Sequence, residues 1–386
     1  MPVPPPCPIL SGVQSPARRC FVHIGLAKTG TSYLQSVFWS ARETLAAQGL
    51  TLLLNQRDHF HLALALRGRL AEGDIAPKAF TVLDRFSAAA ATVSPDSDAL
   101  ITQERLAAAK IAQVHQLLDL LPGWEVHVII TARDLGRQLP SVWQETVRKF
   151  GALGYDEYVQ AVVDRSPLAG NFWSRQGIID VAARWARGVS AERTHIVTVP
   201  PSGSAQGLLL ERFCSVVGVD PTLLDTTAAV SNVSLGYSQT ELLRRVKISL
   251  GESLGDPDAA AVKWGTTYLA KDVLAPQGGH PPEFPRRLQD WCRQTSEEAI
   301  AELRSRGYHI IGDLAELMPH FPPPSQPEPV IGDAEVAATA ARALATVVAE
   351  GYADMEQRRR LRARLLKEAK RLSTRDRGAG QSRAEE

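Results

Sequence analysis

Residues 20–35, CFVHIGLAKTGTSYLQ, run from an apolar stretch through a loop into a helical pattern. The first five residues are typical of a short buried strand, and the loop 25–32 follows it without a break. Apolar side chains then recur at helical spacing from Tyr33 to Leu45. A strand, a loop with two glycines and a helix in this order are typical of the first unit of an open parallel sheet.

The same alternation of strand and helix patterns continues along the chain. The run Val126–Thr131 is continuous and mostly β-branched, as expected of a strand buried on both faces. We therefore predict an α/β fold, an open and mostly parallel sheet flanked by helices, with a helical C-terminal extension. Further strands are predicted at 50–54, 99–102 and 195–199, and helices at 79–92, 110–121, 139–149, 155–163, 178–187, 240–250 and 285–306.

The length of 386 residues exceeds the size at which a single core stops growing, so we expect one large domain with an appendage. Residues 1–17 are rich in proline and predict a flexible lead-in. The α/β domain is expected to span 18–318, and the proline-rich stretch 319–332 to form a linker. Residues 333–386 then predict a helical extension with a charged tail.

The composition is that of an ordinary globular protein, with 44% hydrophobic and 22% charged residues. A net charge of +1 provides no overall attraction to nucleic acid, so any anion site must be local. The N-terminus lacks the features of a signal peptide, and no stretch approaches the ~20 apolar residues of a membrane span. Four cysteines without a CxxC pair predict free thiols and hence a cytoplasmic protein, and the abundance of Ala, Arg and Leu suits a bacterial source.

The loop 25–32 has the chemistry of an anion site. In parallel sheets, ligands bind beyond the carboxyl ends of the strands, which is where this loop lies. Two glycines allow the backbone to approach an anion, and the first N–H groups of the following helix attract one. Lysine adds a positive charge and three hydroxyls add hydrogen-bond donors; these residues are Gly25, Lys28, Thr29, Gly30, Thr31 and Ser32.

A nucleoside-triphosphate loop is the first alternative, and its spacing does not fit. That loop has the pattern G-x-x-x-x-G-K-[ST], with the lysine directly after the second glycine. Here Lys28 precedes Gly30 by two residues, and no convincing aspartate follows an apolar strand to hold magnesium. The loop therefore predicts a different phosphate ligand.

A second anion site is predicted where the strand 126–131 ends. Arg133 follows this strand closely, and a guanidinium can bind a phosphate through two parallel hydrogen bonds. Ser141 comes eight residues later, where we expect the next helix to begin with Pro140 in its first turn. Its hydroxyl and the nearby N–H groups would complete a phosphate site.

Together these two segments resemble sulfotransferases that use 3′-phosphoadenosine-5′-phosphosulfate (PAPS). The segment HIGLAKTGTSYLQ is similar to the 5′-phosphosulfate loop of that family, and TARDLGRQLPSVWQE to its 3′-phosphate motif, especially in bacterial members. The resemblance covers roughly residues 20–235. It implies a sulfotransferase fold related to the P-loop nucleotide hydrolases, with Lys28 stabilising the leaving group and no metal. It also implies that PAPS is held by Ala27, Lys28, Thr29, Gly30, Thr31, Ser32, Arg133 and Ser141.

Members of this family use a histidine or a glutamate as general base, and its position varies. Glu104 follows the strand 99–102 and is our first candidate, although its charge could simply favour a helix N-terminus. His59 and His61 follow the strand 50–54 and are the rivals. Imidazole has a suitable pKa for the task, although a histidine beside an apolar helix is often structural.

The acceptor has no signature in the sequence. Specificity lies in loops that carry no readable code, so lipid and peptide acceptors also remain open. We expect the acceptor group to be a hydroxyl or amine of a small molecule or a glycan. A small-molecule kinase and an inactive nucleotide-binding or scaffold relative remain alternatives. The oligomeric state and the role of the C-terminal helix are open as well.

Overall fold

The computed structural model describes residues 18–70, 77–149, 151–205, 207–227, 235–254, 267–321 and 331–381. The side chains of 252–254 and 367–381 are not included in that description. The expected lead-in 1–17 and residues 322–330 of the expected linker therefore lie outside the described residues.

The described residues contain one six-stranded sheet, in the order β2-β3-β1-β4-β5-β6, and every pairing in it is parallel. This confirms the predicted α/β fold. β1 lies between β3 and β4, so the winding direction reverses beside it, and such a reversal is where parallel sheets bind ligands. The strands are β1 (Arg19–His23), β2 (Leu50–Leu52), β3 (Asp98–Thr102), β4 (Glu125–Ala132), β5 (Thr194–Thr198) and β6 (His309–Ile311).

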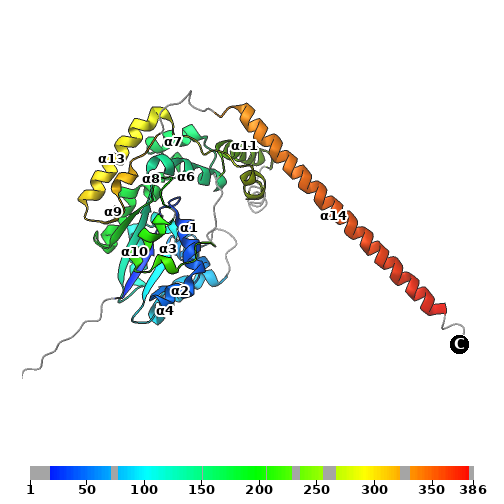
Figure 1. Ribbon diagram of the computed structural model, residues 1–386, viewed down its shortest axis with the longest axis horizontal. Helices are drawn as coiled ribbons and strands as arrows, with labels where there is room; N and C mark the ends of the chain where they lie inside the picture. Colours follow the sequence, from blue (N-terminus) through cyan, green and yellow to red (C-terminus); the bar gives the residue numbers. More distant parts are fainter. Residues whose placement is uncertain are drawn as a thin grey trace, which may run out of the picture. The chain divides into compact units, whose positions relative to one another are not determined.

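Helices cover both faces of this sheet (Figure 1). Side chains alternate between the faces, so Val22 of β1 enters one core while its neighbour Phe21 enters the other. The core containing Val22 includes α3 (Gln56–Leu66), α4 (Val82–Thr92), α5 (Ile111–Asp119), α9 (Ile178–Val189) and α13 (Gln289–Ser305). The core containing Phe21 includes α1 (Thr31–Ser40), α2 (Arg42–Ala47) and α10 (Leu208–Val217).

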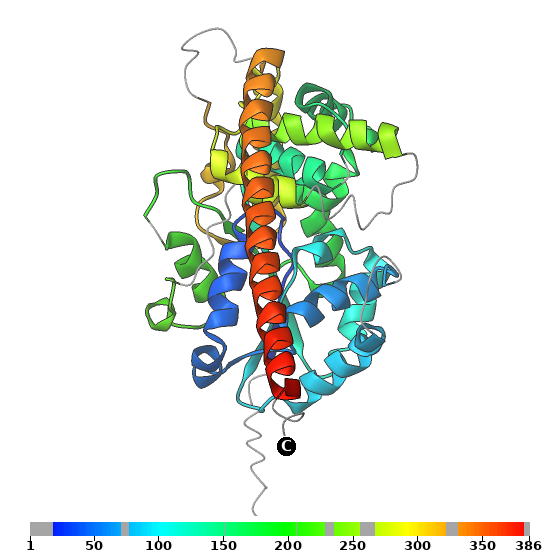
Figure 2. The ribbon, with the colours of Figure 1, turned by 90° about the vertical axis from the view of Figure 1, so that its right-hand side faces the viewer.

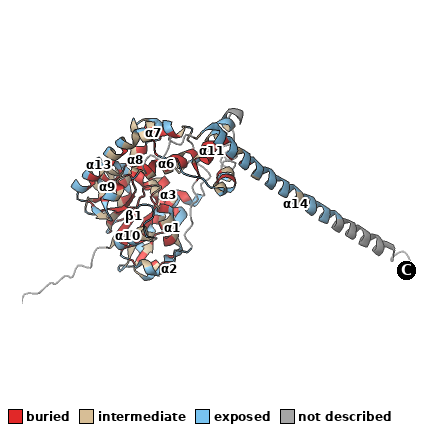
Figure 3. Ribbon diagram, turned by 45° about the horizontal axis from the view of Figure 1, so that its top comes forward, coloured by how far each residue is buried: buried red, intermediate tan, exposed pale blue. Residues whose placement is uncertain are grey.

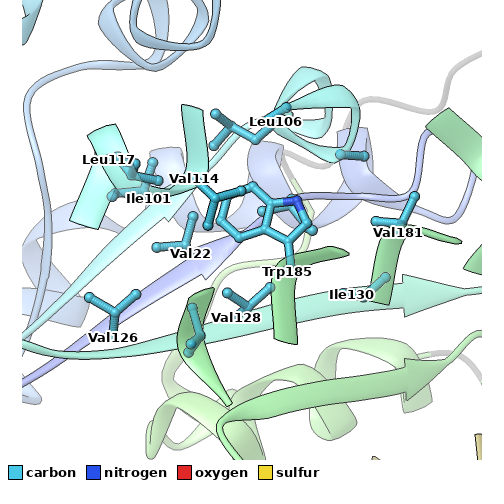
Figure 4. Packing of buried hydrophobic residues seen from close by; sticks show 14 of the residues in the cluster. Val22, Ile101, Leu106, Val114, Leu117, Val126, Val128, Ile130, Val181 and Trp185 are labelled. Atoms are coloured by element: carbon cyan, nitrogen blue, oxygen red, sulfur yellow. The ribbon is translucent and has the colours of Figure 1, made fainter. Parts of the chain in front are cut away.

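Trp185 of α9 lies at the centre of the first core. Its side chain is fully buried, and Figure 4 shows the indole among Val114 of α5, Val128 of β4 and Val181 of its own helix. The indole Nε1 is also buried and has no hydrogen-bond partner among the described residues. This side chain therefore stabilises the sheet through packing alone.

The helix after β4, α6 (Leu135–Lys149), begins four residues before the predicted start. Asp134 accounts for this, because its Oδ1 accepts a hydrogen bond from the N–H of Arg137 at 2.9 Å and so caps the helix. Pro140 consequently lies inside the helix, and the prediction that it occupies the first turn is wrong. Ser141 is also interior, and its hydroxyl donates to the carbonyl of Arg137 at 3.1 Å.

The chain divides into two units that differ from the boundaries predicted at 318 and 333. Unit 1 comprises Met1–Glu145, Gly154–Asn232 and Glu283–Glu328, and so contains the sheet. Unit 2 comprises Thr146–Leu153, Val233–Pro282 and Pro329–Glu386. Segment 233–282, which we had expected in the α/β domain, therefore groups with the C-terminal helix.

Unit 2 is helical in the part that is described. It contains α11 (Tyr237–Leu254), the π-helical turn Leu269–Leu274 and α14 (Asp333–Gln381), which is long and straight (Figures 1 and 2). The helix predicted from 333 is thus confirmed. None of the helices in the described ranges is both long enough and apolar enough to cross a membrane.

Two shorter helices of unit 1 are α7 (Tyr155–Val163) and α8 (Phe172–Gln176).

Candidate functional site

The loop after β1 is fixed against the neighbouring strand. The N–H of Leu26 donates to the carbonyl of Thr131 at 2.9 Å, and the N–H of Thr131 donates to the carbonyl of Gly25 at 2.6 Å. Gly25, Lys28 and Gly30 have positive φ angles of 105°, 68° and 85°. The backbone thus turns sharply between the end of β1 and the start of α1.

The N-terminus of α1 has no side-chain cap. Its N-cap is Gly30, which has no side chain to accept from the first-turn N–H groups, and the first turn contains no acidic residue. These N–H groups and the helix dipole favour an anion there. The φ angle of Gly30 favours glycine, and a Cβ there would also displace the end of the Leu209 side chain of α10.

Arg133 brings the second motif to this loop. Its Nη1 donates to the carbonyl oxygen of Lys28 at 3.2 Å, so the two predicted anion sites lie side by side. Among the described residues, Nε of Arg133 is buried and has no hydrogen-bond partner. Burial, helped by the charge of Arg137 and opposed by Asp134, lowers the pKa of Arg133 to about 10, so it remains charged at neutral pH. A buried charged donor without an acceptor is suited to an anionic ligand.

The start of α6 is held by a second arginine. Arg137 pairs with the buried Asp134 carboxylate and also donates through Nη1 to the carbonyl of Pro200, at 3.2 Å. These contacts tie the residue after Arg133 to the segment that follows β5. Arg137 thus stabilises the start of α6, whereas Nε of Arg133 remains available to a ligand.

Glu145 of α6 is a charged residue of the site that the sequence did not reveal. Its Oε2 lies 3.9 Å from Nζ of Lys28, and the two side chains are 26% and 28% exposed. The ammonium of Lys28 is therefore held beside a carboxylate at the surface of the site.

Glu104 lies at the same edge of the sheet, as predicted. It is the first residue of the short 3₁₀ helix Glu104–Ala108 after β3, and its Oε2 accepts from Nε2 of Gln35 at 3.2 Å. A Cβ built on Gly25 would lie 3.1 Å from Cβ of Glu104, which places Glu104 against the Lys28 loop.

The two rival histidines are both buried. His59 Nε2 donates to the carbonyl of Leu53 at 2.6 Å, while Nδ1 accepts from the N–H of Thr102 at 3.2 Å. Both ring nitrogens are thus engaged, and burial lowers the pKa of His59 to about 4. His61 is 2% exposed, and its Nδ1 lies 4.0 Å from the Asp58 carboxylate. These surroundings fit structural histidines better than a base that must meet an acceptor.

Buried polar side chains of β1, β3 and β4 form a hydrogen-bonded layer next to the loop 25–32. Nδ1 of His23 lies 2.9 Å from the hydroxyl of Thr102 on β3, and its Nε2 lies 3.4 Å from that of Thr131 on β4. The Thr131 hydroxyl lies 2.5 Å from the hydroxyl of Thr29, which also contacts the carbonyl of Leu26. The Thr29 side chain therefore points into the protein, and it can offer only its backbone to a ligand.

The other predicted cofactor residues occupy different positions around the loop. Thr31 begins α1 and is buried, Ser32 is exposed, and Ala27 is half-buried. Ser141 is half-buried, and its hydroxyl is engaged with the carbonyl of Arg137. The structure thus brings Lys28, Arg133 and Glu104 to one sheet edge, and the side chain of Ser141 would have to turn to join them.

Buried neutral histidines make the stability of the fold dependent on pH. Burial lowers the pKa of His23 to about 3 and that of His59 to about 4; burial and the adjacent His127 and His309 lower that of His195 to about 3. Below pH ~6.5 these histidines bind protons in the unfolded chain but stay neutral in the folded chain. The free energy of unfolding is therefore highest above this pH and falls below it. Each of these histidines is expected to lower the free energy of unfolding by about 2 kcal/mol between pH 7 and 5.

Urea unfolding at a series of pH values measures this slope. His23→Asn is expected to reduce the slope of the unfolding free energy against pH by the contribution of about one bound proton. The exposed His115→Asn is the matched control and should leave it unchanged. An equal slope in all three proteins would contradict the assignment of His23 as a buried neutral group.

No protein-family model matches this chain, and no curated protein matches it. Among solved structures, the chain is similar to the crystal structure of a sulfotransferase from Alicyclobacillus acidocaldarius. The two are 15% identical, the TM-score is 0.38, and the match covers 64% of this chain and 99% of that chain.

Proposed function

We propose that this chain is a sulfotransferase that moves a sulfuryl group from PAPS to a hydroxyl or amine of an acceptor. The observation that carries the proposal is the convergence of the two motifs, since Arg133 donates to the carbonyl of Lys28 at 3.2 Å across 105 residues of sequence. PAPS has phosphate groups on both its 3′ and 5′ sides. Two adjacent cationic sites at one sheet edge suit such a ligand.

The residues of the site divide the work between binding and charge stabilisation. Arg133 binds the 3′-phosphate, because its fork of donors matches a phosphate and its buried Nε gains an acceptor. Lys28 and the first N–H groups of α1 bind the 5′ side. Bound PAPS supplies a sulfuryl group that is attacked in line at sulfur, and adenosine 3′,5′-bisphosphate leaves. Lys28 stabilises the negative charge that develops on the leaving oxygen, and this scheme requires no metal ion.

Glu104 is the general base of the proposal. Cα and Cβ of Glu104 lie against the Lys28 loop. Its carboxylate accepts from the neutral amide of Gln35, a contact that leaves it able to take the proton of the acceptor. The acceptor is a small molecule or a glycan. We place the reaction in the cytoplasm, where the buried free thiols of Cys20, Cys214 and Cys292 persist in the reduced state.

Calorimetric titration with adenosine 3′,5′-bisphosphate tests the cofactor directly. We expect binding that is lost when the ligand is adenosine 5′-monophosphate, because the 3′-phosphate is then missing. Arg133→Ala should weaken the binding of the bisphosphate by about 10- to 100-fold, because the loss of a charged hydrogen-bond partner costs about 1.5–3 kcal/mol of binding free energy.

The exposed Arg187→Ala in α9 is the matched control and should bind as the unaltered chain does. A preference for ATP with magnesium over the bisphosphate would replace the proposal by the kinase alternative. Tight bisphosphate binding without transfer to any of a broad acceptor panel would indicate an inactive relative.

A further inference from the structure

Gln35 connects Glu104 to the hydrogen-bonded layer next to the loop 25–32. Its Nε2 lies 3.2 Å from Oε2 of Glu104 and 3.4 Å from the hydroxyl of Thr102. That hydroxyl also lies 2.9 Å from Nδ1 of His23. Because Gln35 belongs to α1, the helix whose first turn borders the loop also contacts the carboxylate of Glu104.

The hydrogen bonds of this layer have one consistent direction. The hydroxyl of Thr29 donates to the carbonyl of Leu26, so the hydroxyl of Thr131 must donate to Thr29. Thr131 has no second hydrogen, so it accepts from Nε2 of His23, whose Nδ1 in turn accepts from the hydroxyl of Thr102. Burial lowers the pKa of His23 to about 3, and a neutral imidazole has one donor and one acceptor, as this direction requires.

This direction fixes the amide of Gln35. Because the hydrogen of the Thr102 hydroxyl is directed at His23, its oxygen presents a lone pair to Gln35, and the carboxylate of Glu104 can only accept. Both acceptors therefore face the NH2 group of Gln35, which has two hydrogens to donate. The opposite orientation of the amide would direct its carbonyl oxygen at a carboxylate. Gln35 is thus held as a donor to Glu104.

The support that Gln35 gives to Glu104 comes from a packed helix. α1 buries one side against the sheet, through Leu34, Val37 and Phe38, and exposes part of the other (Figure 3). Glu104 is half-buried, and in the described part of the chain Gln35 is the hydrogen-bond partner of its carboxylate. A catalytic group has to be held within about 0.5 Å of its productive position, which requires such a partner on a rigid element.

We propose that Gln35 is the positioning residue of the general base and holds the carboxylate of Glu104 toward the acceptor. This inference rests on the proposed function, in which Glu104 takes the acceptor's proton. In that step the acceptor atom bonds to sulfur, and the bond from sulfur to the leaving oxygen breaks with its electron pair on that oxygen. The proton of the acceptor moves to Glu104. Gln35 acts only through the orientation of that carboxylate.

Release of adenosine 3′,5′-bisphosphate from PAPS, with water and with para-nitrophenol as acceptors, measures the effect. Gln35→Leu is expected to lower kcat by about 10- to 100-fold, because a displaced catalytic group can cost about 100-fold. The KM for PAPS and the calorimetric affinity for the bisphosphate should change by less than about twofold, because Lys28 and Arg133 are untouched. The matched control is Gln48→Leu, which removes another half-buried, hydrogen-bonded glutamine just before β2 and should keep full turnover.

A double-mutant cycle separates positioning from a general structural role. Glu104→Ala should lower turnover more than Gln35→Leu does, because it removes the base itself. In the Glu104→Ala background, Gln35→Leu should cost no further turnover, since Gln35 acts only through that carboxylate. Urea unfolding of the same four proteins without ligand should also be non-additive, by at least about twofold in the unfolding equilibrium constant, because the two side chains are in contact.

The outcomes distinguish this proposal from the proposed function. Equal losses of turnover by Gln35→Leu in both backgrounds, full turnover by Gln35→Leu, or additive unfolding free energies would overturn the role of Gln35 alone. A loss of bisphosphate affinity as large as the loss of kcat would do the same, because Gln35 would then support the nucleotide site. Full turnover by Glu104→Ala would remove the base and with it this role of Gln35. An unaltered chain that neither binds the bisphosphate nor turns over PAPS would contradict the proposed function itself.

Discussion

Replacing Lys28 by alanine is expected to lower the rate of sulfuryl transfer by about 10²–10³, if the proposed function holds. The loss arises because Lys28 is the full positive charge of the loop, beside the uncapped N-terminus of α1, where the leaving oxygen would become negative. Turnover measured with PAPS and an accepted substrate gives the rate. Binding of adenosine 3′,5′-bisphosphate should fall much less, since Arg133 still holds its 3′-phosphate.

Stability provides the comparison for this variant. The Lys28 side chain is 28% exposed and its ion pair with Glu145 is long, at 3.9 Å, so the urea midpoint should hardly move. The exposed Lys78→Ala is the matched control and should keep full activity. Full turnover by Lys28→Ala would contradict the role of the lysine, even if the bisphosphate still binds.

Trp185→Ala is expected to lower the free energy of unfolding by about 3–5 kcal/mol, the usual cost of truncating a large buried aromatic residue. The indole is fully buried between α9 and the sheet (Figure 4), and α5 packs on its other side, so the cavity would be closed on every face. Urea unfolding followed by circular dichroism measures the change.

Two further substitutions give this prediction its contrast. Trp185→Phe should cost far less, because a ring still fills most of the space and the unpartnered Nε1 donor is removed. Leu168→Ala, at a side chain that is 72% exposed, should stay within about 0.5 kcal/mol of the unaltered chain. A similar loss in Trp185→Phe and Trp185→Ala would show that the ring's volume is not what stabilises this core.

The central strands were predictable because their sequences are unambiguous. β1, β3, β4 and β5 are short apolar runs bounded by loops, and burial on both faces requires such runs. β6 was missed because it has three residues and follows the long helix α13 without a pattern of its own. The grouping of 146–153 with 233–282 in one unit could not be predicted from the sequence either, because it depends on packing between distant segments.

Within the site, the backbone motifs could be read from the sequence and the side-chain partners could not. Lys28, Arg133 and Glu104 each follow a strand, so their positions at one sheet edge were predictable, whereas their roles stay predictions. The start of α6 was misjudged because Pro140 resembles a first-turn proline, whereas the cap is the Asp134 carboxylate. Glu145 was missed because its distance from Lys28 is set by the direction of α6, which no local pattern encodes.

If the proposed function holds, the carboxylate of Glu145 weakens the binding of small lone anions at Lys28. Because it lies 3.9 Å from Lys28, an arriving phosphate or sulfate ion meets a cation that already has a counter-charge, as well as a repelling neighbour. A ligand that also reaches Arg133 gains a second charged contact, which offsets that repulsion. Under the proposed function, this internal competitor would favour a nucleotide with two phosphate positions over a lone oxyanion, without any contact to the base or the sugar.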